Sequence, residues 1–197
     1  MSVRTRIAPS PTGYFHLGNL RVALTNYAMA RQNEGQFIWR NEDTDQERFI
    51  ADALEFNMKW VHEFGLDWDE GPDKGGEYAP YTQTERLPLY KEAYEKLIVN
   101  DYAYKCFCTK ERLDELRQMQ QMAKQQTKYD GLCRHLSQGE IENNLKEEKP
   151  FTVRIKVPKD RKIAFDDIIT HNHVVCDSND VDDYIIVKSN GIPTYHL

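Results

Sequence analysis

Apolar residues in the first 65 positions alternate between short unbroken runs and longer segments where they recur at helical spacing. The runs predict strands over 3–9 and 36–43, and the helical spacing predicts helices over 16–35 and 45–65, the second of which Asp45 could cap. The order strand, helix, strand, helix is typical of an α/β unit with parallel strands. Ligands of such units bind beyond the carboxyl ends of the strands, where the segments APSPTG and NEDTD lie.

The pattern changes after this unit. Glycine, proline and acidic residues predict a loop over 66–86, and helical spacing returns over 87–101. A Gln/Met/Lys-rich helix is predicted within 102–126, and alternating apolar and polar residues over 147–176 indicate antiparallel strands. Residues 182–197 predict a strand, a tight turn at SNG and a further extended segment.

Composition restricts the class of protein. The 197 residues are 40% hydrophobic and 29% charged, with a net charge of −6, which argues against a basic nucleic-acid coat protein but allows a local basic face. No apolar run approaches the ~18 residues of a membrane span, and the N-terminus lacks an apolar signal core, so we predict a cytoplasmic protein. The apolar end at Leu197 suggests a fragment of a longer fold.

The segment APSPTGYFHLGN is a candidate phosphate site. Pro9 and Pro11 fix the backbone, Gly13 permits a close approach, and His16 and Gly18 fall at the start of the predicted helix. Free N–H groups and the dipole at a helix start favour phosphate, although the segment is not a Walker loop. A proline-rich turn with a purely structural histidine explains the same pattern.

The acidic segment NEDTD is equally open when taken alone. Its three acids follow a predicted strand and could bind a metal or an ammonium group, or simply cap the next helix.

The cysteines indicate a metal site. Cys106-x-Cys108 and Cys133-x-His135 provide two short arms with four ligands of the kinds that tetrahedral zinc prefers. Four protein ligands would close the site and make it structural. Reduced, packed cysteines are the alternative, and Cys176 has no partner in the pattern.

Several long segments together resemble one family. RIAPSPTGYFHLGNLRVALTNYAMAR, GQFIWRNEDTD, PYTQTERLPLYKEAYEKL, YDGLCRH and KSNGIPTYHL are similar to bacterial-type glutamyl-tRNA synthetases, which are class I aminoacyl-tRNA synthetases. HLGN stands where this family has His-Ile-Gly-His, with Asn19 at the variable fourth position. The resemblance implies an α/β, Rossmann-type nucleotide-binding domain, incomplete here, with an inserted α+β acceptor-binding module that carries the zinc site. It places the first half of the catalytic domain at 1–86, the insert at 87–186 and the start of the second half at 187–197.

The resemblance also implies roles for individual residues. Arg6 would read the side-chain carboxylate of the substrate, and Glu42 would receive its α-ammonium group. Arg48 would lie near the tRNA end. The remaining expectations are Ala8, Ser10 and Tyr195 for the glutamate pocket, Pro9, Thr12, His16 and Gly18 for ATP, His16, Gly18 and Asn19 for catalysis, and Cys106, Cys108, Cys133 and His135 for zinc.

The implied reaction is the ATP- and Mg²⁺-dependent activation of L-glutamate to glutamyl-adenylate, followed by transfer to the 3′ end of tRNA-Glu by a monomeric enzyme. We expect the fragment alone to be inactive, because the lysine-rich second signature and the anticodon-binding domains are missing. Two alternatives stay open: the short glutamyl-queuosine tRNA-Asp synthetase paralogue, and a non-catalytic binding module held together by zinc.

Overall fold

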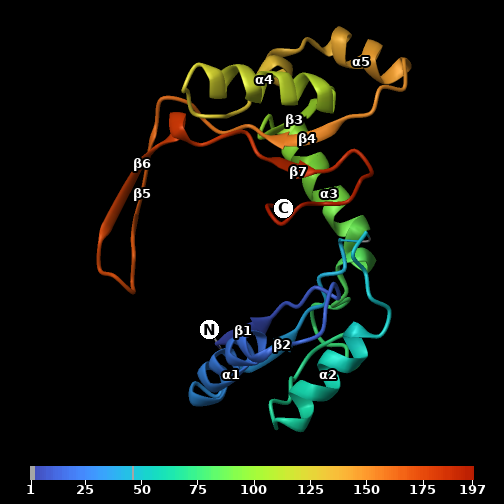
Figure 1. Cartoon of the computed structure of the whole chain (residues 1–197), viewed down its shortest axis with the longest axis vertical. Helices are drawn as coiled ribbons and strands as arrows, with labels where there is room; N and C mark the ends of the chain where they lie inside the picture. The colour runs from blue at the N-terminus through green and yellow to red at the C-terminus, as the bar shows by residue number, and fades with distance from the viewer. Residues whose placement is uncertain (1–2, 46) are drawn as a thin grey trace. The chain divides into compact units, whose positions relative to one another are not determined.

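The computed structural model describes residues 3–45 and 47–197, which form two compact units (Figure 1). The first unit extends to Leu89, and the second comprises Tyr90–Leu197. Each unit has its own core. No helix in the described residues is both long and apolar enough to cross a membrane.

The first unit follows the predicted order of elements. It contains β1 (Arg4–Ile7), α1 (Leu17–Gln32), β2 (Gln36–Trp39), α2 (Ala53–Glu63) and the short 3-10 helix η1 (Gln83–Arg86). β1 and β2 pair in parallel, in register from Arg4 opposite Gln36 to Ile7 opposite Trp39. A bridge between Ile38 and Glu70 adds a further extended segment next to β2. The predicted α/β unit with parallel strands is therefore confirmed.

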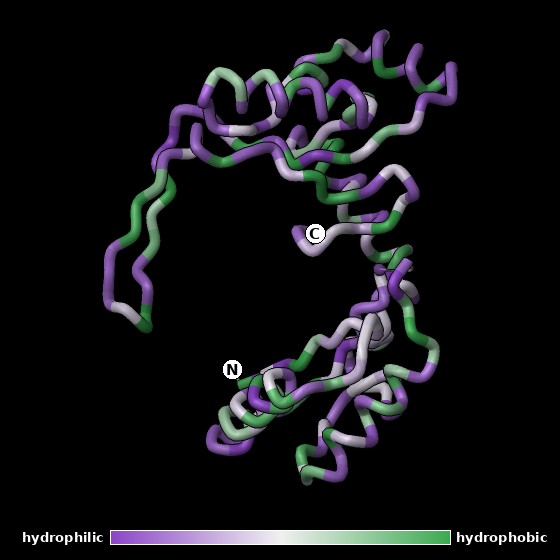
Figure 2. Tube along the Cα trace, in the orientation of Figure 1, coloured by the Kyte–Doolittle hydropathy of each residue, from purple (hydrophilic) through white to green (hydrophobic). Residues whose placement is uncertain are grey.

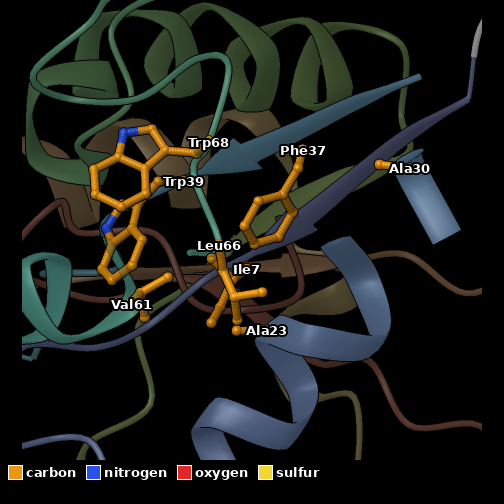
Figure 3. Close-up of a cluster of buried hydrophobic side chains, with 8 residues drawn as sticks. All are labelled: Ile7, Ala23, Ala30, Phe37, Trp39, Val61, Leu66 and Trp68. Carbon is orange, nitrogen blue, oxygen red and sulfur yellow. The ribbon is translucent and has the colours of Figure 1, made fainter. Parts of the chain in front are cut away.

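Aromatic and aliphatic side chains together form the core of the first unit (Figure 3). Phe37 and Trp39 of β2 are fully buried, and the ring of Trp39 lies 5.1 Å from the ring of Trp68. Ala23 and Ala30 are the buried residues of α1. Small residues at these positions let the helix backbone approach the strands closely, so β1 and the start of α1 are held in fixed positions.

The second helix is shorter than its pattern predicts. We expected a helix over 45–65, but α2 begins at Ala53, and residues 47–52 are not helical. The Ile50 amide donates to the Pro11 carbonyl at 2.8 Å, which ties this segment to the loop after β1 instead of into a helix. Asp45 forms an ion pair with Arg48 and is not the cap of α2. Position 46 lies outside the described residues.

The second unit is built around a three-stranded antiparallel sheet in the order β3-β4-β7. The strands are β3 (Ala103–Cys106), β4 (Thr152–Ile155) and β7 (Ile185–Val187), and residues of α3 (Leu87–Val99) pack against them. Its other elements are α4 (Lys110–Met122), η2 (Leu132–His135), α5 (Gln138–Lys146), the hairpin of β5 (Lys162–Asp166) and β6 (His173–Asp177), and η3 (Ser178–Asp180).

The sequence patterns in this unit are partly confirmed. The antiparallel strands within 147–176 and the turn at Gly191 form as predicted. One strand and one α-helix were missed: β3, which carries Cys106, and α5. The capping box of Ser137 and Glu140 is a sequence signal that would have located α5.

A buried carboxylate joins the strands of the second unit. Asp183 accepts hydrogen bonds from the Tyr104 hydroxyl at 2.7 Å, from Arg134 at 2.6 Å and from the Val157 amide at 3.0 Å. Burial beside this acid raises the pKa of the Tyr104 hydroxyl far above its ordinary value, so the hydroxyl stays a donor. The network fixes η2 against the sheet.

The end of the chain folds back within the second unit. The Lys188 amide donates to the Ile192 carbonyl at 2.9 Å, and the Thr194 amide donates to the Ile186 carbonyl at 2.9 Å. The predicted return into a nucleotide-binding domain near residue 187, and the other predicted domain boundaries, stay predictions.

Candidate functional site

Charged side chains converge at the carboxyl ends of β1 and β2. One Glu42 carboxylate oxygen accepts from Arg40 Nε at 2.6 Å and lies 3.6 Å from Arg6, while the other accepts from Gln83 Nε2 at 2.9 Å. The Glu42 amide donates to the Pro9 carbonyl at 2.8 Å, which fixes the carboxylate beside the loop that follows β1. Arg6 and Glu42, predicted from distant parts of the sequence, are therefore neighbours.

This group of charges is accessible to a small ligand. The Arg6 side chain is 40% exposed and that of Glu42 is 23% exposed. A guanidinium can bind a carboxylate through two parallel hydrogen bonds, and a carboxylate can accept from an ammonium group. Placed side by side, the two residues can hold the two charged ends of a small zwitterion. Arg40 neutralises part of the charge on Glu42.

His16 begins α1 and folds its ring back over the first turn. Its Nδ1 accepts from the Gly18 amide at 3.1 Å, and its own amide donates to the Asn19 side-chain oxygen at 3.2 Å. A Cβ at position 18 would lie 2.8 Å from Cε1 of the histidine ring. Glycine at position 18 is therefore required for the ring to cap the helix.

The cap determines which atoms can meet a phosphate. Gly18 and Asn19 donate their amides to His16. These two N–H groups are therefore used within the helix start, contrary to our prediction that N–H groups there are free to bind phosphate. Because Nδ1 accepts, a neutral His16 ring carries its proton on Nε2. That N–H and the positive end of the helix dipole are the groups available to an anion.

The loop after β1 contains the other residues predicted for ATP and glutamate. Ala8, Pro9 and Thr12 are half-buried, and Ser10 is exposed. Pro11 is buried and accepts from the Ile50 amide, so the loop is held at both ends.

Two further predicted residues make other contacts. Arg48 is 76% exposed and pairs with Asp45 at 2.5 Å. Tyr195 belongs to the second unit, is 94% exposed and contacts the ring of His196. Their assignments to tRNA and to the glutamate pocket stay predictions.

Three cysteines of the second unit come together. The sulfurs of Cys106, Cys108 and Cys133 lie within 4.8 Å of one another, a spacing that one metal ion can bridge. The Tyr129 hydroxyl lies 3.4 Å from the sulfurs of Cys106 and Cys108 and accepts from the Cys133 amide at 2.9 Å. His135, the predicted fourth ligand, is not in this cluster of ligand atoms.

The electrostatics of the cluster favour a thiolate. The Cys133 thiol donates to the sulfur of Cys106, which lowers the pKa of Cys106 well below its ordinary value. Arg154 places its guanidinium 3.9 Å from the centre of the Tyr129 ring, and Arg112 donates to the Cys108 sulfur at 3.6 Å. Thiolate is the form in which cysteine binds metals, so the donor set fits a zinc ion.

Sequence reasoning missed three residues of these clusters. Arg40 and Gln83 contact Glu42, and no spacing in the sequence connects Gln83 with a residue 41 positions earlier. Tyr129 precedes Cys133 by four residues, and this short spacing is the signal that could have identified it.

The first unit is an α/β unit with a cluster of charged side chains at the carboxyl ends of two parallel strands. Residues 2–197 match the family described as "tRNA synthetases class I (E and Q), catalytic domain", and the chain belongs to this family.

Its relatives are much longer than this chain. It is 49% identical over 195 residues to a curated glutamate–tRNA ligase of Dehalococcoides mccartyi strain CBDB1, covering 99% of this chain and 38% of the relative. It is 44% identical over 203 residues to that of Alkaliphilus metalliredigens, covering 100% of this chain and 41% of the relative.

Solved structures of the same family superpose closely on this chain. A glutamate–tRNA ligase from Elizabethkingia meningosepticum, crystallised with its amino acid, superposes with a TM-score of 0.91 at 39% identity, covering all of this chain and 40% of that one. The synthetase from Elizabethkingia anophelis gives the same TM-score and identity and is covered over 41% of its length.

Proposed function

We propose that the full-length protein is a glutamate–tRNA ligase, which activates L-glutamate with ATP and Mg²⁺ and transfers it to tRNA-Glu. The observation that carries the proposal is the contact of Arg6 with Glu42 at the ends of β1 and β2. The names of the relatives support glutamate as the amino acid, and they favour neither the glutamyl-queuosine paralogue nor a non-catalytic module.

In the proposed first step, Arg6 binds the γ-carboxylate of glutamate and Glu42 binds its ammonium group. Substrate binding would replace the 3.6 Å contact between these two side chains with two contacts to the ligand. Glutamine lacks the second carboxylate, so it would leave the guanidinium without its anion and be rejected.

His16 and the start of α1 would act on the phosphates. When the α-carboxylate of glutamate attacks the α-phosphate and pyrophosphate leaves, negative charge is redistributed over the phosphate oxygens. The Nε2–H of His16 and the helix dipole would stabilise that charge without rearrangement. Ala8, Pro9, Ser10 and Thr12 would shape the backbone against which the two substrates lie.

We propose that zinc binds Cys106, Cys108 and Cys133 and holds η2 against the end of β3 as a structural ion. The fourth ligand is the Tyr129 hydroxyl, which already lies among the sulfurs, or the predicted His135. Acceptor-end binding by the second unit, a monomeric enzyme and a cytoplasmic location complete the proposal.

Titration of the full-length protein with a non-hydrolysable glutamyl-adenylate mimic tests this function. We expect Arg6→Lys and Glu42→Gln each to weaken binding at least ~10-fold, because each removes one charged contact to the amino acid. Arg48→Lys is the control and should bind as the wild type. Equal affinity of all four proteins would contradict the proposal.

A further inference from the structure

The β5–β6 hairpin of the second unit has one face made only of apolar side chains. Its register places Ile163 opposite Cys176 and Phe165 opposite Val174. Directly opposed residues of an antiparallel pair share a face, and neighbouring residues along a strand point to opposite faces. These four residues form what we call the hairpin face.

The other side of the hairpin carries charged and polar pairs at both ends. Lys162 lies opposite Asp177 and Asp166 lies opposite His173, with only Ala164 and Val175 between these polar pairs. His173 Nδ1 lies 2.7 Å from a carboxylate oxygen of Asp166. This side has the charged pairs that suit water, so the hairpin is amphipathic across its two faces.

Within the second unit, most of the hairpin face is exposed: Ile163, Phe165 and Cys176 are exposed, and Val174 is half-buried. Phe165 is 54% exposed and Ile163 is 43% exposed, and none of the four residues joins a core cluster of the described residues. Every residue of β5 is exposed, and Figures 1 and 2 show the two strands projecting from the second unit with hydrophobic positions along them. A two-stranded hairpin with an uncovered apolar face is marginally stable in water.

The tip and the base of the hairpin are nevertheless well defined. Asp167 accepts from the amides of Ile169 and Thr170 at 2.8 and 2.9 Å, and these bonds lower the pKa of its carboxyl. This turn leaves Ile168 and Ile169 87% and 85% exposed. At the base, fully buried Ser178 accepts from the Arg161 amide at 2.9 Å. A structured ribbon that presents apolar residues suits docking.

We propose that the hairpin face and the two tip isoleucines pack against the part of the full-length polypeptide that is absent from this chain. The chain covers only 38–41% of its relatives' length, so most of the polypeptide is available to cover this surface. The inference does not depend on which amino acid the enzyme activates.

Cys176 lies on the hairpin face and serves as the reporter of this contact. We would expose the full-length protein to N-ethylmaleimide and follow the peptide containing residue 176 by mass spectrometry. The matched control is Val175→Cys in a Cys176→Ser background, because residue 175 is next in the strand but points to the opposite side. We expect Cys176 to react at least ~20-fold more slowly than the cysteine at position 175.

A second pair of variants separates docking from local stiffness. Phe165→Asp should accelerate the labelling of Cys176 at least ~10-fold, whereas Ala164→Asp on the opposite side should leave it unchanged. If Phe165→Asp does not fold, the comparison of the labelling rates at positions 176 and 175 tests the proposal by itself.

Three results would overturn the proposal. Rates at the two positions within ~3-fold of each other would show an uncovered face. Protection that disappears on dilution would identify a second copy as the partner, and protection that appears only with added tRNA would identify RNA. A protein that protects Cys176 but does not glutamylate tRNA would refute the proposed function and leave this inference standing.

Discussion

Replacing Gly18 with alanine tests whether the position of the His16 ring matters more to the reaction than to the stability of α1. The new Cβ would lie 2.8 Å from Cε1 and 3.0 Å from Nδ1 of that ring, closer than side-chain contacts allow. The ring must therefore move, and its hydrogen bond from the Gly18 amide is lost. The added Cβ meets only this ring, so the perturbation is confined to the start of the helix.

Two opposing terms determine the effect on folding. Losing a side-chain cap costs about 0.5–2 kcal/mol, and replacing glycine with alanine inside a helix returns about 0.5–1 kcal/mol. We therefore expect the melting temperature of the full-length protein to fall by less than about 4 °C. The effect on chemistry should be larger, because removing one aligned donor from a developing charge typically costs about 10²–10³ in rate.

The assay is ATP–pyrophosphate exchange with glutamate and tRNA-Glu, alongside a thermal melt of each full-length protein. Gly139→Ala is the control, because it lies in α5 of the second unit and a Cβ there meets no atom within 4 Å, so its exchange rate should stay close to that of the wild type. An exchange rate of Gly18→Ala within ~3-fold of the wild type would refute the reasoning, since the ring position would then not matter to the reaction.

Three further predictions concern the metal, a buried charge and pH. Cys133→Ser should reduce zinc, measured by elemental analysis, from about one to below ~0.3 per chain, whereas Cys176→Ser should retain it. Asp183→Asn should lower the free energy of unfolding, measured in urea, by about 3–5 kcal/mol, whereas Asp114→Asn at an exposed ion pair should cost less than about 1 kcal/mol. Bonds from Arg4 hold the pKa of Glu70 below its ordinary 4.5, so its contribution to stability is present above that pH and is lost as pH falls through the lower, folded value. Glu70→Gln should therefore weaken the fall of the melting temperature as the pH drops below about 4.5, and an unchanged slope would contradict this.

Much of the first unit could be predicted because its signals are local. Unbroken apolar runs and helical spacing are properties of neighbouring residues, so β1, α1 and β2 follow from the sequence. The His16-x-Gly18 spacing likewise describes one turn of helix, and the structure supplies its reason in the ring that lies over the glycine. The start of α2 was wrong because Pro11, far away in the chain, takes the amide of Ile50.

The sequence by itself determined the order of elements in the first unit, the loop with His16 and the identity of the three cysteines. Only the tertiary structure decided which groups surround the Glu42 carboxylate and which hydroxyl lies among the thiols. The reason is physical: Gln83 reaches Glu42 across 41 positions, and Tyr129 meets Cys106 across 23. Packing of the two cores brings such residues together, and no local periodicity encodes that distance.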